Sequence, residues 1–348
     1  MSRWRYFLKR VALSVPVLFS VMTFLFIMLR LGPLSPVAAR LGQNASGADV
    51  TRLREQLGLN DPLWQQYIDY VRDLMLFQGE SWVVRAGQPI PEAIASVVPV
   101  TLWLGLWAIM LPLFIGIPLG FYAGLRPNTA GDYVASVSGI LWLSMPNFWL
   151  AVMALAILRQ ADSGLFNWYT LGPNTQSIIG NPDFGFLTTT QLLGVIPVPT
   201  SFDVMAFATD IKLILPAALI LGSASMAAEL RIGRTAVLET VNSNYVEMAK
   251  AKGLKGRTIV WKHIFRNALV PLIPIITNEA FILIGGSVII EYVFNLNGIG
   301  RLYFDALVQG DLPLAGSLVF LFTLVIIFLN IVQDLLYTII DPRVSYQQ

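Results

Sequence analysis

The stretch that decides the fold, residues 245–271, reads YVEMAKAKGLKGRTIVWKHIFRNALVP. It is basic and lies between two long apolar segments. Its first part, up to Lys252, contains good helix formers, and Gly253 is suited to the left-handed conformation that ends a helix. The pattern therefore predicts a short helix that stops at Gly253.

A second helix is predicted to begin at Arg257. Apolar residues recur in it at helical spacing: Trp261, Ile264, Phe265 and Ala268. The basic residues Lys262 and Arg266, together with His263, lie off this stripe. Such a pattern is typical of a basic amphipathic helix at a membrane surface.

Composition assigns the whole chain to the integral membrane proteins. Of its 348 residues, 55% are hydrophobic and 13% are charged, whereas soluble proteins average about 25% charged residues. The absence of cysteine excludes disulfides, thiolate metal sites and a cysteine nucleophile. The net charge of +2 is close to neutral, so the distribution of charge along the chain is more informative than its sum.

Six apolar runs are long enough to cross a membrane, which takes about 20 residues in a helix. They cover residues 11–29, 99–125, 134–158, 211–230, 270–290 and 314–340. The first is longer than the roughly 7 to 15 apolar residues of a signal peptide, so we interpret it as an uncleaved span. The fold class predicted is an all-α integral membrane protein with six transmembrane helices.

Two regions between the runs have the composition of water-facing segments. In residues 34–98, one helix is predicted over 49–57, and a second is predicted to start with Asp61 as cap and Pro62 in first position. Its buried side is expected to hold Leu63, Tyr67, Tyr70, Val71 and Leu74. This region serves either substrate or receptor contact or packing alone. The loop 160–210 is a lid, a receptor-docking surface or a plain connection.

The second apolar run contains a repeated small-residue spacing. Gly116, Gly120 and Gly124 lie four residues apart, an arrangement that lets another helix approach closely. Pro112 and Pro118 are able to bend the run. We interpret the glycines as a packing face within the helix bundle, with homodimerisation through the same face as the alternative.

Basic residues indicate how the chain is oriented. Four of them, Arg3, Arg5, Lys9 and Arg10, precede the first apolar run, and many others gather in the loop 231–270. Most carboxylates lie in the longer loops on the other side of the predicted membrane. The positive-inside rule therefore predicts that both termini and the loop 231–270 are cytoplasmic.

The central stretch resembles a known coupling loop. Residues 247–253 have the spacing E-x-A-x-x-x-G, AKGL follows at 251–254, and RNAL precedes Pro271. Together these resemble the coupling loop of ABC transporter permeases, most closely the first-subunit type of the dipeptide/oligopeptide (peptide/nickel) importer family. The sequence departs from the general motif at Met248, where alanine is usual, and in its more distant closing proline. Further similar stretches are SMPNFW at 144–149, LPA at 215–217, GIGRL at 298–302 and DPR at 341–343.

The resemblance implies an ABC importer permease of the type I fold, with an external helical region between the first two spans. Its expected domains are a cytoplasmic N-terminus with the first span over 1–33, the external region over 34–98, and a permease core of five spans over 99–341. A cytoplasmic tail is expected over 342–348. The core would include the external loop 160–210 and the cytoplasmic coupling loop 231–270.

The same resemblance implies partners and sites. A second homologous permease, two ATP-binding subunits, an extracytoplasmic substrate-binding protein and the lipid bilayer of a prokaryotic inner membrane are expected, and no nucleic acid. Residues expected to contact an ATPase are Tyr245, Glu247, Ala249, Ala251, Lys252, Gly253 and Leu254. The substrate class is dipeptides, oligopeptides or related small solutes.

Several chemistries are excluded by missing motifs. There is no G-x-x-x-x-G-K-[ST] phosphate loop, so no cofactor is expected in this chain, and ATP and Mg are expected in the partner subunits. His263 is the only histidine, which argues against a zinc site or a Ser-His-Asp triad and hence against an enzyme. The alternative function is a self-sufficient secondary transporter or channel, but inverted repeats and multiple intramembrane charges are not evident.

Three residues are candidates for the translocation path. Glu279 lies about 11 residues into the fifth run, which places it near the membrane centre. A carboxylate there is expected to face the bundle interior, either to meet a cationic substrate group or to hydrogen-bond a partner such as Asn330. Asn278, on an adjacent face, and Asn147, in the SMPNFW stretch, are the other candidates.

Overall fold

The computed structural model describes residues 3–31, 47–56, 58–160, 168, 172–173, 179–192, 196–285 and 288–340. This part is mostly helical, as predicted. Its first half contains α1 (Arg3–Leu31), α3 (Gly47–Gln56), α4 (Leu63–Met75), α5 (Ile90–Ala95), α6 (Val98–Leu111), the π-helical turn η1 (Pro112–Gly116), α7 (Ile117–Leu125), α8 (Ala130–Leu143) and α9 (Asn147–Arg159).

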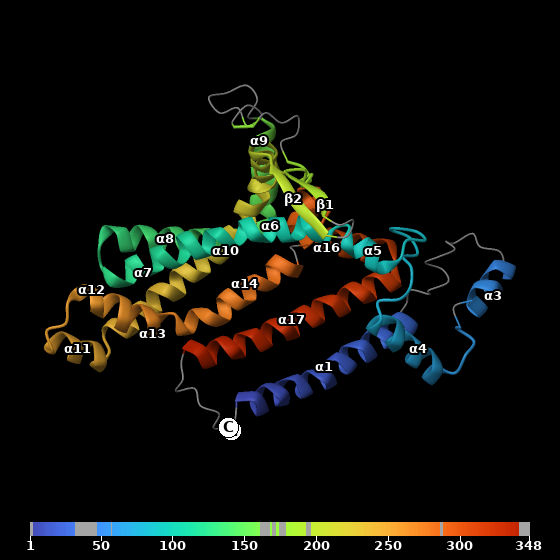
Figure 1. Ribbon diagram of the computed structural model, residues 1–348, viewed down its shortest axis with the longest axis horizontal. Helices are drawn as coiled ribbons and strands as arrows, with labels where there is room; N and C mark the ends of the chain where they lie inside the picture. The colour runs from blue at the N-terminus through green and yellow to red at the C-terminus, as the bar shows by residue number, and fades with distance from the viewer. Residues whose placement is uncertain are drawn as a thin grey trace.

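The second half begins with a β-hairpin and returns to helices. Its elements are β1 (Leu187–Leu192), β2 (Ile196–Phe202), α10 (Val204–Val241), α11 (Asn244–Ala251), α12 (Gly256–Thr258), the π-helix η2 (Ile259–Phe265), α13 (Arg266–Ala268), the 3-10 turn η3 (Val270–Leu272), α14 (Ile273–Gly285), α15 (Val288–Val293), α16 (Ile299–Gln309) and α17 (Leu312–Ile340). In Figure 1, α1, α17 and α14 run side by side, with α11, α12 and α13 at one end of the molecule and α4, α5 and α16 at the other.

Within the described residues, four helices are long and apolar enough to cross a membrane. They are Ile90–Leu125, Val204–Val241, Gly256–Thr277 and Leu312–Leu336. The bent pair α8 and α9 makes a fifth if it counts as one span, and the apolar part of α1, Ala12–Met28, is shorter. The structure thus confirms a multi-span helical protein, whereas the predicted total of six spans is not confirmed.

The third apolar run is not the single continuous helix that residues 134–158 suggested. α8 and α9 meet at an angle of 95°. Ser144 ends α8, and Pro146 precedes α9 with an extended ψ of 134°. Because proline lacks an N–H and disfavours helical geometry in the residue before it, the helix is interrupted at this point.

α10 is the helix around which the others pack, and the end of η1 and α7 approach it through their glycines. A Cβ on Gly120 would lie 2.6 Å from the carbonyl oxygen of Leu230, and one on Gly116 would lie 2.8 Å from that of Met226. A Cβ on Gly124 would meet the Val237 side chain at 2.6 Å. These glycines therefore form a packing face within the subunit, as predicted. At Pro112, one of the two prolines expected to bend the run, the α-helix changes to the π-helical turn η1.

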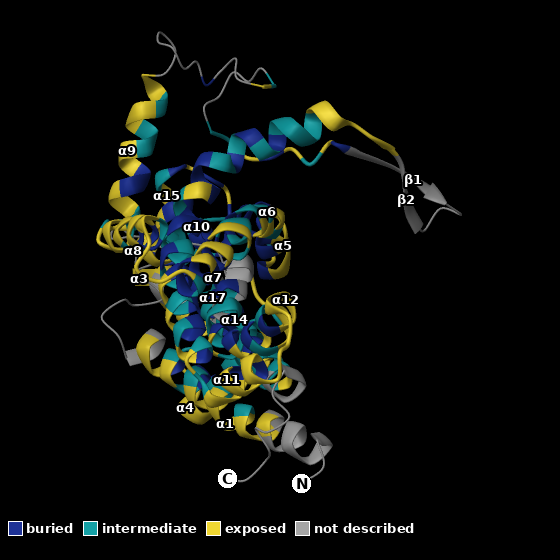
Figure 2. Cartoon of the chain, turned by 90° about the vertical axis from the view of Figure 1, so that its left-hand side faces the viewer, coloured by how far each residue is buried: buried dark blue, intermediate teal, exposed yellow. Residues whose placement is uncertain are grey.

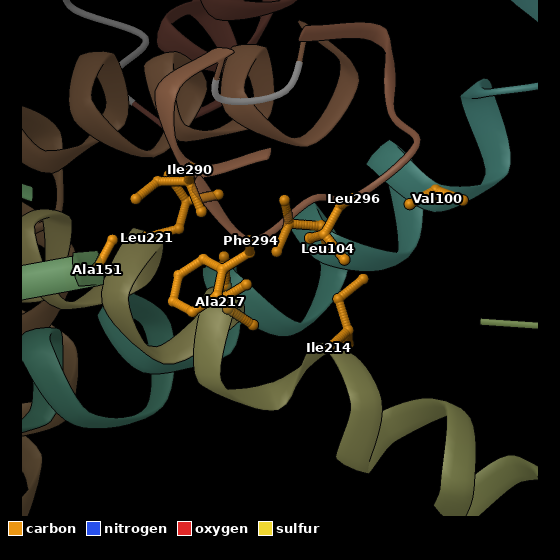
Figure 3. Close-up of a cluster of buried hydrophobic side chains, with 11 residues drawn as sticks. Val100, Leu104, Ala151, Ile214, Ala217, Leu221, Ile290, Phe294 and Leu296 are labelled. Carbon is orange, nitrogen blue, oxygen red and sulfur yellow. The ribbon is translucent and has the colours of Figure 1, made fainter. Parts of the chain in front are cut away.

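The largest buried cluster joins α10 to α6 and α15. Figure 3 shows Ile214, Ala217 and Leu221 of α10 beside Leu104 of α6 and Phe294 at the end of α15. Burial of such apolar surface is the main source of stability in the water-facing parts of the molecule, while close packing replaces it inside the membrane. α9 joins this cluster through Ala151, although most of its surface is exposed (Figure 2).

The outer helix α1 is held to α17 at both ends. Arg10 and Asp334 form an ion pair with an N–O distance of 2.6 Å. Toward the other end, Met22 is fully buried with Leu74 of α4 and Phe320 of α17. α4 thus packs against both α1 and α17.

The helix that follows Asp61 departs in detail from the prediction. α4 starts at Leu63 with Pro62, rather than Asp61, at its N-cap. Leu63 is 60% exposed, whereas Leu74 is buried as predicted. The side-chain amide of Gln66 donates to the carbonyl oxygens of Leu59 and Asp61 and so ties the preceding turn to α4.

The predicted loop 160–210 ends earlier than expected. β1 and β2 form an antiparallel hairpin, and α10 begins already at Val204. Asp203 caps α10 by accepting hydrogen bonds from the backbone N–H groups of Met205 and Ala206. Buried Asp210, now inside α10, accepts hydrogen bonds from the N–H groups of Asp183 and Phe184 and so ties the loop to the helix.

A buried carboxyl group, that of Glu291, organises the end of the bundle where α16 begins. Glu291 is fully buried, and its oxygens accept hydrogen bonds from the Thr101 hydroxyl at 3.0 Å and the Arg301 N–H at 2.9 Å. Thr101 in turn accepts from the Ile299 N–H at the start of α16. The contacts join α6, α15 and the N-terminus of α16, where a carboxyl group suits the free N–H groups.

Burial raises the pKa of Glu291 from 4.5 to about 7, against the opposing effect of its hydrogen bonds. The folded protein therefore holds this proton more tightly than the unfolded chain. The resulting stabilisation is complete below about pH 4.5 and is lost as the pH rises to about 7, with a size of at most about 3 kcal/mol.

We predict that the thermal unfolding midpoint of the purified protein falls between pH 5 and pH 8, and that Glu291→Gln reduces this fall because glutamine does not titrate. Glu92→Gln, the same change at an exposed acid of α5, serves as the control. Parallel pH profiles for the wild type and Glu291→Gln would contradict the assignment.

Candidate functional site: the surface of α11 and the acids of α10 and α14

α11 has the predicted glycine-stopped form. Gly253 has a φ of +72°. Its N–H donates to the carbonyl oxygen of Lys250 at 2.9 Å, and the N–H of Leu254 donates to that of Ala249 at 3.3 Å. This pair of hydrogen bonds is the Schellman motif, which needs a residue in the left-handed region and so favours glycine.

α11 is seated on the bundle by two small apolar side chains. Val246 is 0% and Ala249 is 5% exposed. They belong to one buried cluster with Val237 of α10, Ile264 of η2 and Ala268 of α13. The helix that enters the loop and the helices that leave it are therefore packed together beneath α11.

The other predicted contact residues face outward. Tyr245 is 43% and Leu254 is 41% exposed. The remaining exposed members of the set are Glu247, Ala251, Lys252 and Gly253. Of the predicted contact residues, Ala249 alone is buried. It can therefore affect partner binding only by holding α11 in place on the bundle.

The surface around α11 is both apolar and basic. Met248 and Trp261 are 59% and 60% exposed. The exposed basic side chains are Lys250, Lys252, Lys255, Arg257, Lys262 and Arg266. We call the exposed residues of 244–266 the α11 surface; it offers apolar anchors in a positive surround, which suits a protein partner with an acidic rim.

The predicted amphipathic stripe after Arg257 is correct only in part. Ile264 and Ala268 are buried, but Trp261 is exposed. Residues 259–265 form a π-helix, whose i→i+5 hydrogen bonds widen the turn and shift the helical phase. Trp261 consequently rotates outward, with its ring centroid 5.1 Å from that of Phe265.

An ion pair beside this surface was not anticipated from the sequence. Buried Asp132, in the first turn of α8, accepts hydrogen bonds from both Nε and an Nη of Arg234 on α10, at 2.5 and 2.8 Å. The N–H of Asn128 also donates to it. The bidentate geometry fixes α8 to α10 shortly before α10 reaches α11. Asp132 and Arg234 are 102 positions apart in the sequence, so no short motif could have predicted this ion pair.

The membrane part holds a second polar group of residues. Glu279 on α14 is 8% exposed. Asn330, the partner suggested from the sequence, is exposed on α17. Asn278 precedes it on α14, but its side chain lies outside the described part of the structure. Asn147 is the half-buried first residue of α9, at the 95° bend.

Glu229 of α10 is an acid that sequence reasoning missed. It is 0% exposed, and neither carboxylate oxygen has a hydrogen-bond partner among the described residues. The sequence did contain a signal for it, because Glu229 is a charged residue near the end of the fourth apolar run, residues 211–230.

Family models cover most of the chain. Residues 116–346 match the family described as the inner membrane component of binding-protein-dependent transport systems, and residues 3–91 match the family of its N-terminal part. The sequence is 31% identical to the oligopeptide transport system permease protein AppB of Bacillus subtilis over 98% of this chain and 99% of that protein. It is 31% identical to the dipeptide transport system permease protein DppB of Alkalihalophilus pseudofirmus over the same shares.

A solved structure shares the fold. A chain of the MetNI methionine ABC transporter in an inward-facing conformation matches with a TM-score of 0.50 and 17% identity, over 73% of this chain and 99% of that one. This likeness extends to the arrangement of helices only, whereas the sequence matches extend along nearly the full length. The chain therefore belongs to the family of inner-membrane permease components of binding-protein-dependent ABC transport systems.

Proposed function

We propose that this chain is the transmembrane permease subunit of an ATP-driven importer for dipeptides, oligopeptides or related small solutes. The observation that carries the proposal is the α11 surface, a short exposed helix seated on the bundle at the end opposite α4, α5 and α16 (Figure 1). The names of the relatives support the substrate class. Membership of the family favours this function over a self-sufficient secondary transporter or channel.

The proposed complex contains partners for each task that this chain lacks. Two ATP-binding subunits hold ATP and Mg, a second homologous permease completes the path, and an extracytoplasmic binding protein delivers the solute. Exposed apolar side chains on α8 and α9, among them Val134, Ile140 and Ile157, leave a surface for lipid or for the second permease.

Force enters through α11 in this proposal. An ATP-binding subunit takes up the exposed side of α11, and closure of the ATP-binding subunits displaces it. Because Val246 and Ala249 are buried against α10, η2 and α13, the displacement is passed to the spans on both sides of the loop. Close-packed cores switch between discrete arrangements and do not deform smoothly, so a small push produces alternating access.

The orientation of the chain is part of the proposal: both termini and the loop 231–270 are cytoplasmic, and the external region faces outward. We predict that in sealed cells a membrane-impermeant maleimide labels Asp61→Cys and leaves Lys255→Cys unlabelled until the membrane is opened. Both positions are exposed, and the chain has no other cysteine. Labelling of Lys255→Cys from outside would reverse the orientation.

The coupling role is tested at Gly253. A Cβ there meets no atom within 4 Å, so Gly253→Val acts only through the left-handed backbone, where a β-branched residue costs about 1 to 2 kcal/mol. We predict that the variant inserts normally but loses most substrate-stimulated ATP hydrolysis and uptake in the assembled complex. Gly256→Val is the matched control, since Gly256 also has open space but no left-handed φ.

The proposed coupling is wrong if Gly253→Val co-purifies with the ATP-binding subunits as well as the wild type does and retains full stimulated hydrolysis. A loss shared equally by Gly256→Val would point to the loop's general shape instead of the seating of α11.

A further inference from the structure

A cavity of about 320 Å³ lies beside α4, where this helix packs against α1 and α17. Its apolar walls include Phe26 of α1, Leu74 of α4 and Leu312 of α17. Its polar lining is mostly acidic and contains the carboxyl groups of Asp61, Asp69, Asp73 and Glu80. We call this space the α4 cavity. It lies away from the α11 surface, and the coupling proposed above does not involve it.

The lining of the α4 cavity carries a negative charge in the part of the chain that the structure describes. No lysine, arginine or histidine is among the described residues that line it. Arg72 of α4 approaches Asp69 and Asp73 at N–O distances of 3.5 Å, and 59% of its own side chain is exposed, so these ion pairs are weak. The described acids form no group that could hold a metal ion. The cavity therefore suits an organic cation.

A buried hydroxyl group in the cavity points independently to a ligand. Ser317 of α17 lines the cavity and is 2% exposed. Its side chain takes part in none of the hydrogen bonds of the described residues, whereas Thr323 of the same helix donates to the carbonyl oxygen of Val319. Buried polar groups normally have a partner. An N–H donor inside the cavity supplies one for the Ser317 oxygen.

α4 also presents an exposed apolar stripe. Trp64, Ile68 and Met75 are 66%, 56% and 51% exposed, and their helical spacing places them on one side of α4. Asp69 and Asp73, which line the cavity, lie on a different side. An exposed stripe that contains tryptophan is typical of a helix at the membrane surface. α4 and the cavity beside it are therefore expected at the level of the lipid headgroups.

We propose that the α4 cavity binds the primary ammonium group of a zwitterionic lipid whose headgroup is phosphoethanolamine. An ammonium group has three N–H donors and no acceptor, so it matches the carboxylates of the lining and the Ser317 hydroxyl. The rings of Tyr70 and Trp82 line the same space and attract a cation. Exposed Arg72, beside the acids of α4, is placed to bind the phosphate of the same headgroup. The inference goes beyond the proposed function and does not depend on transport.

The test uses the full complex purified in detergent and measures its thermal unfolding midpoint. The soluble short-chain lipid dihexanoyl phosphatidylethanolamine is titrated against the wild type, Asp73→Asn and Asp183→Asn. A ligand that binds only the folded state raises the midpoint as its concentration rises. Asp73→Asn removes one charge from the cavity, and Asp183→Asn, the matched control, makes the same change at an exposed acid outside it.

We predict that the lipid raises the midpoint of the wild type and of Asp183→Asn equally. Asp73→Asn is predicted to need about tenfold more lipid for the same rise, because it loses a charge-assisted hydrogen bond. Dihexanoyl phosphatidylcholine, whose trimethylated headgroup has no N–H donor, is predicted to bind about tenfold more weakly to the wild type. Equal effects of the two lipids, or an unchanged lipid requirement in Asp73→Asn, overturn the proposal.

Ser317→Ala separates ligand binding from packing. Alanine removes a buried hydroxyl that has no partner among the described residues, so the midpoint without lipid is predicted not to fall. The lipid requirement is predicted to rise about fivefold, the effect of one lost hydrogen bond. A lower midpoint together with an unchanged lipid requirement contradicts a place for Ser317 in the site.

A soluble amine is the other source of an ammonium group. Free ethanolamine and the dipeptide Ala-Ala are therefore titrated in the same way. The proposal predicts that neither raises the midpoint at concentrations at which the lipid saturates its effect. If either one acts as strongly as the lipid, and acts more weakly on Asp73→Asn, the cavity is a site for soluble cations and the assignment to lipid is overturned.

Discussion

The close approach of α7 to α10 is the constraint on which the rest of the structure depends. Gly116, Gly120 and Gly124 bring the backbones together so closely that a Cβ at any of them would collide with α10. In a membrane, where burial of apolar surface contributes little between helices, such contact is a main source of cohesion. It positions α10 as one long helix from the β1–β2 hairpin to α11, with α6 and α8 packed against it.

The two ends of the bundle are built on opposite principles. At one end, α11 is held by small apolar side chains and leaves its basic, partly apolar side exposed. At the other, buried carboxyl groups fix the backbone: Glu291 binds the start of α16, and Asp311 accepts hydrogen bonds from Ser81 and from the N–H groups of Val83 and Val84. One end of the bundle is thus fixed by buried carboxyl groups, and at the other end α11 is packed on the bundle with one side exposed. This arrangement suits a protein in which a displacement of α11 opens the opposite face.

The local features were predictable from the sequence and the distant ones were not. The helix that stops at Gly253 and the glycine face of α7 follow from residues that lie within one or two turns of each other. Pro146 was a local signal for the 95° bend, but the apolar run continues across it, so hydropathy alone did not predict the bend. The outward turn of Trp261 depends on a π-helix that periodicity does not reveal. The full burial of Glu229 depends on how the other helices pack around α10, which composition does not show.

The central claim is that α11 and α10 move as one body. Its most direct test is a distance measurement by pulsed electron paramagnetic resonance between spin labels at Thr235→Cys on α10 and Lys250→Cys on α11, both exposed in a chain without cysteine. The labels are followed in transport-competent complexes, first without nucleotide and then with ATP bound and hydrolysis blocked. The account predicts the same distance distribution in both states. A shift of several ångströms between them would show that α11 moves independently and would contradict the account.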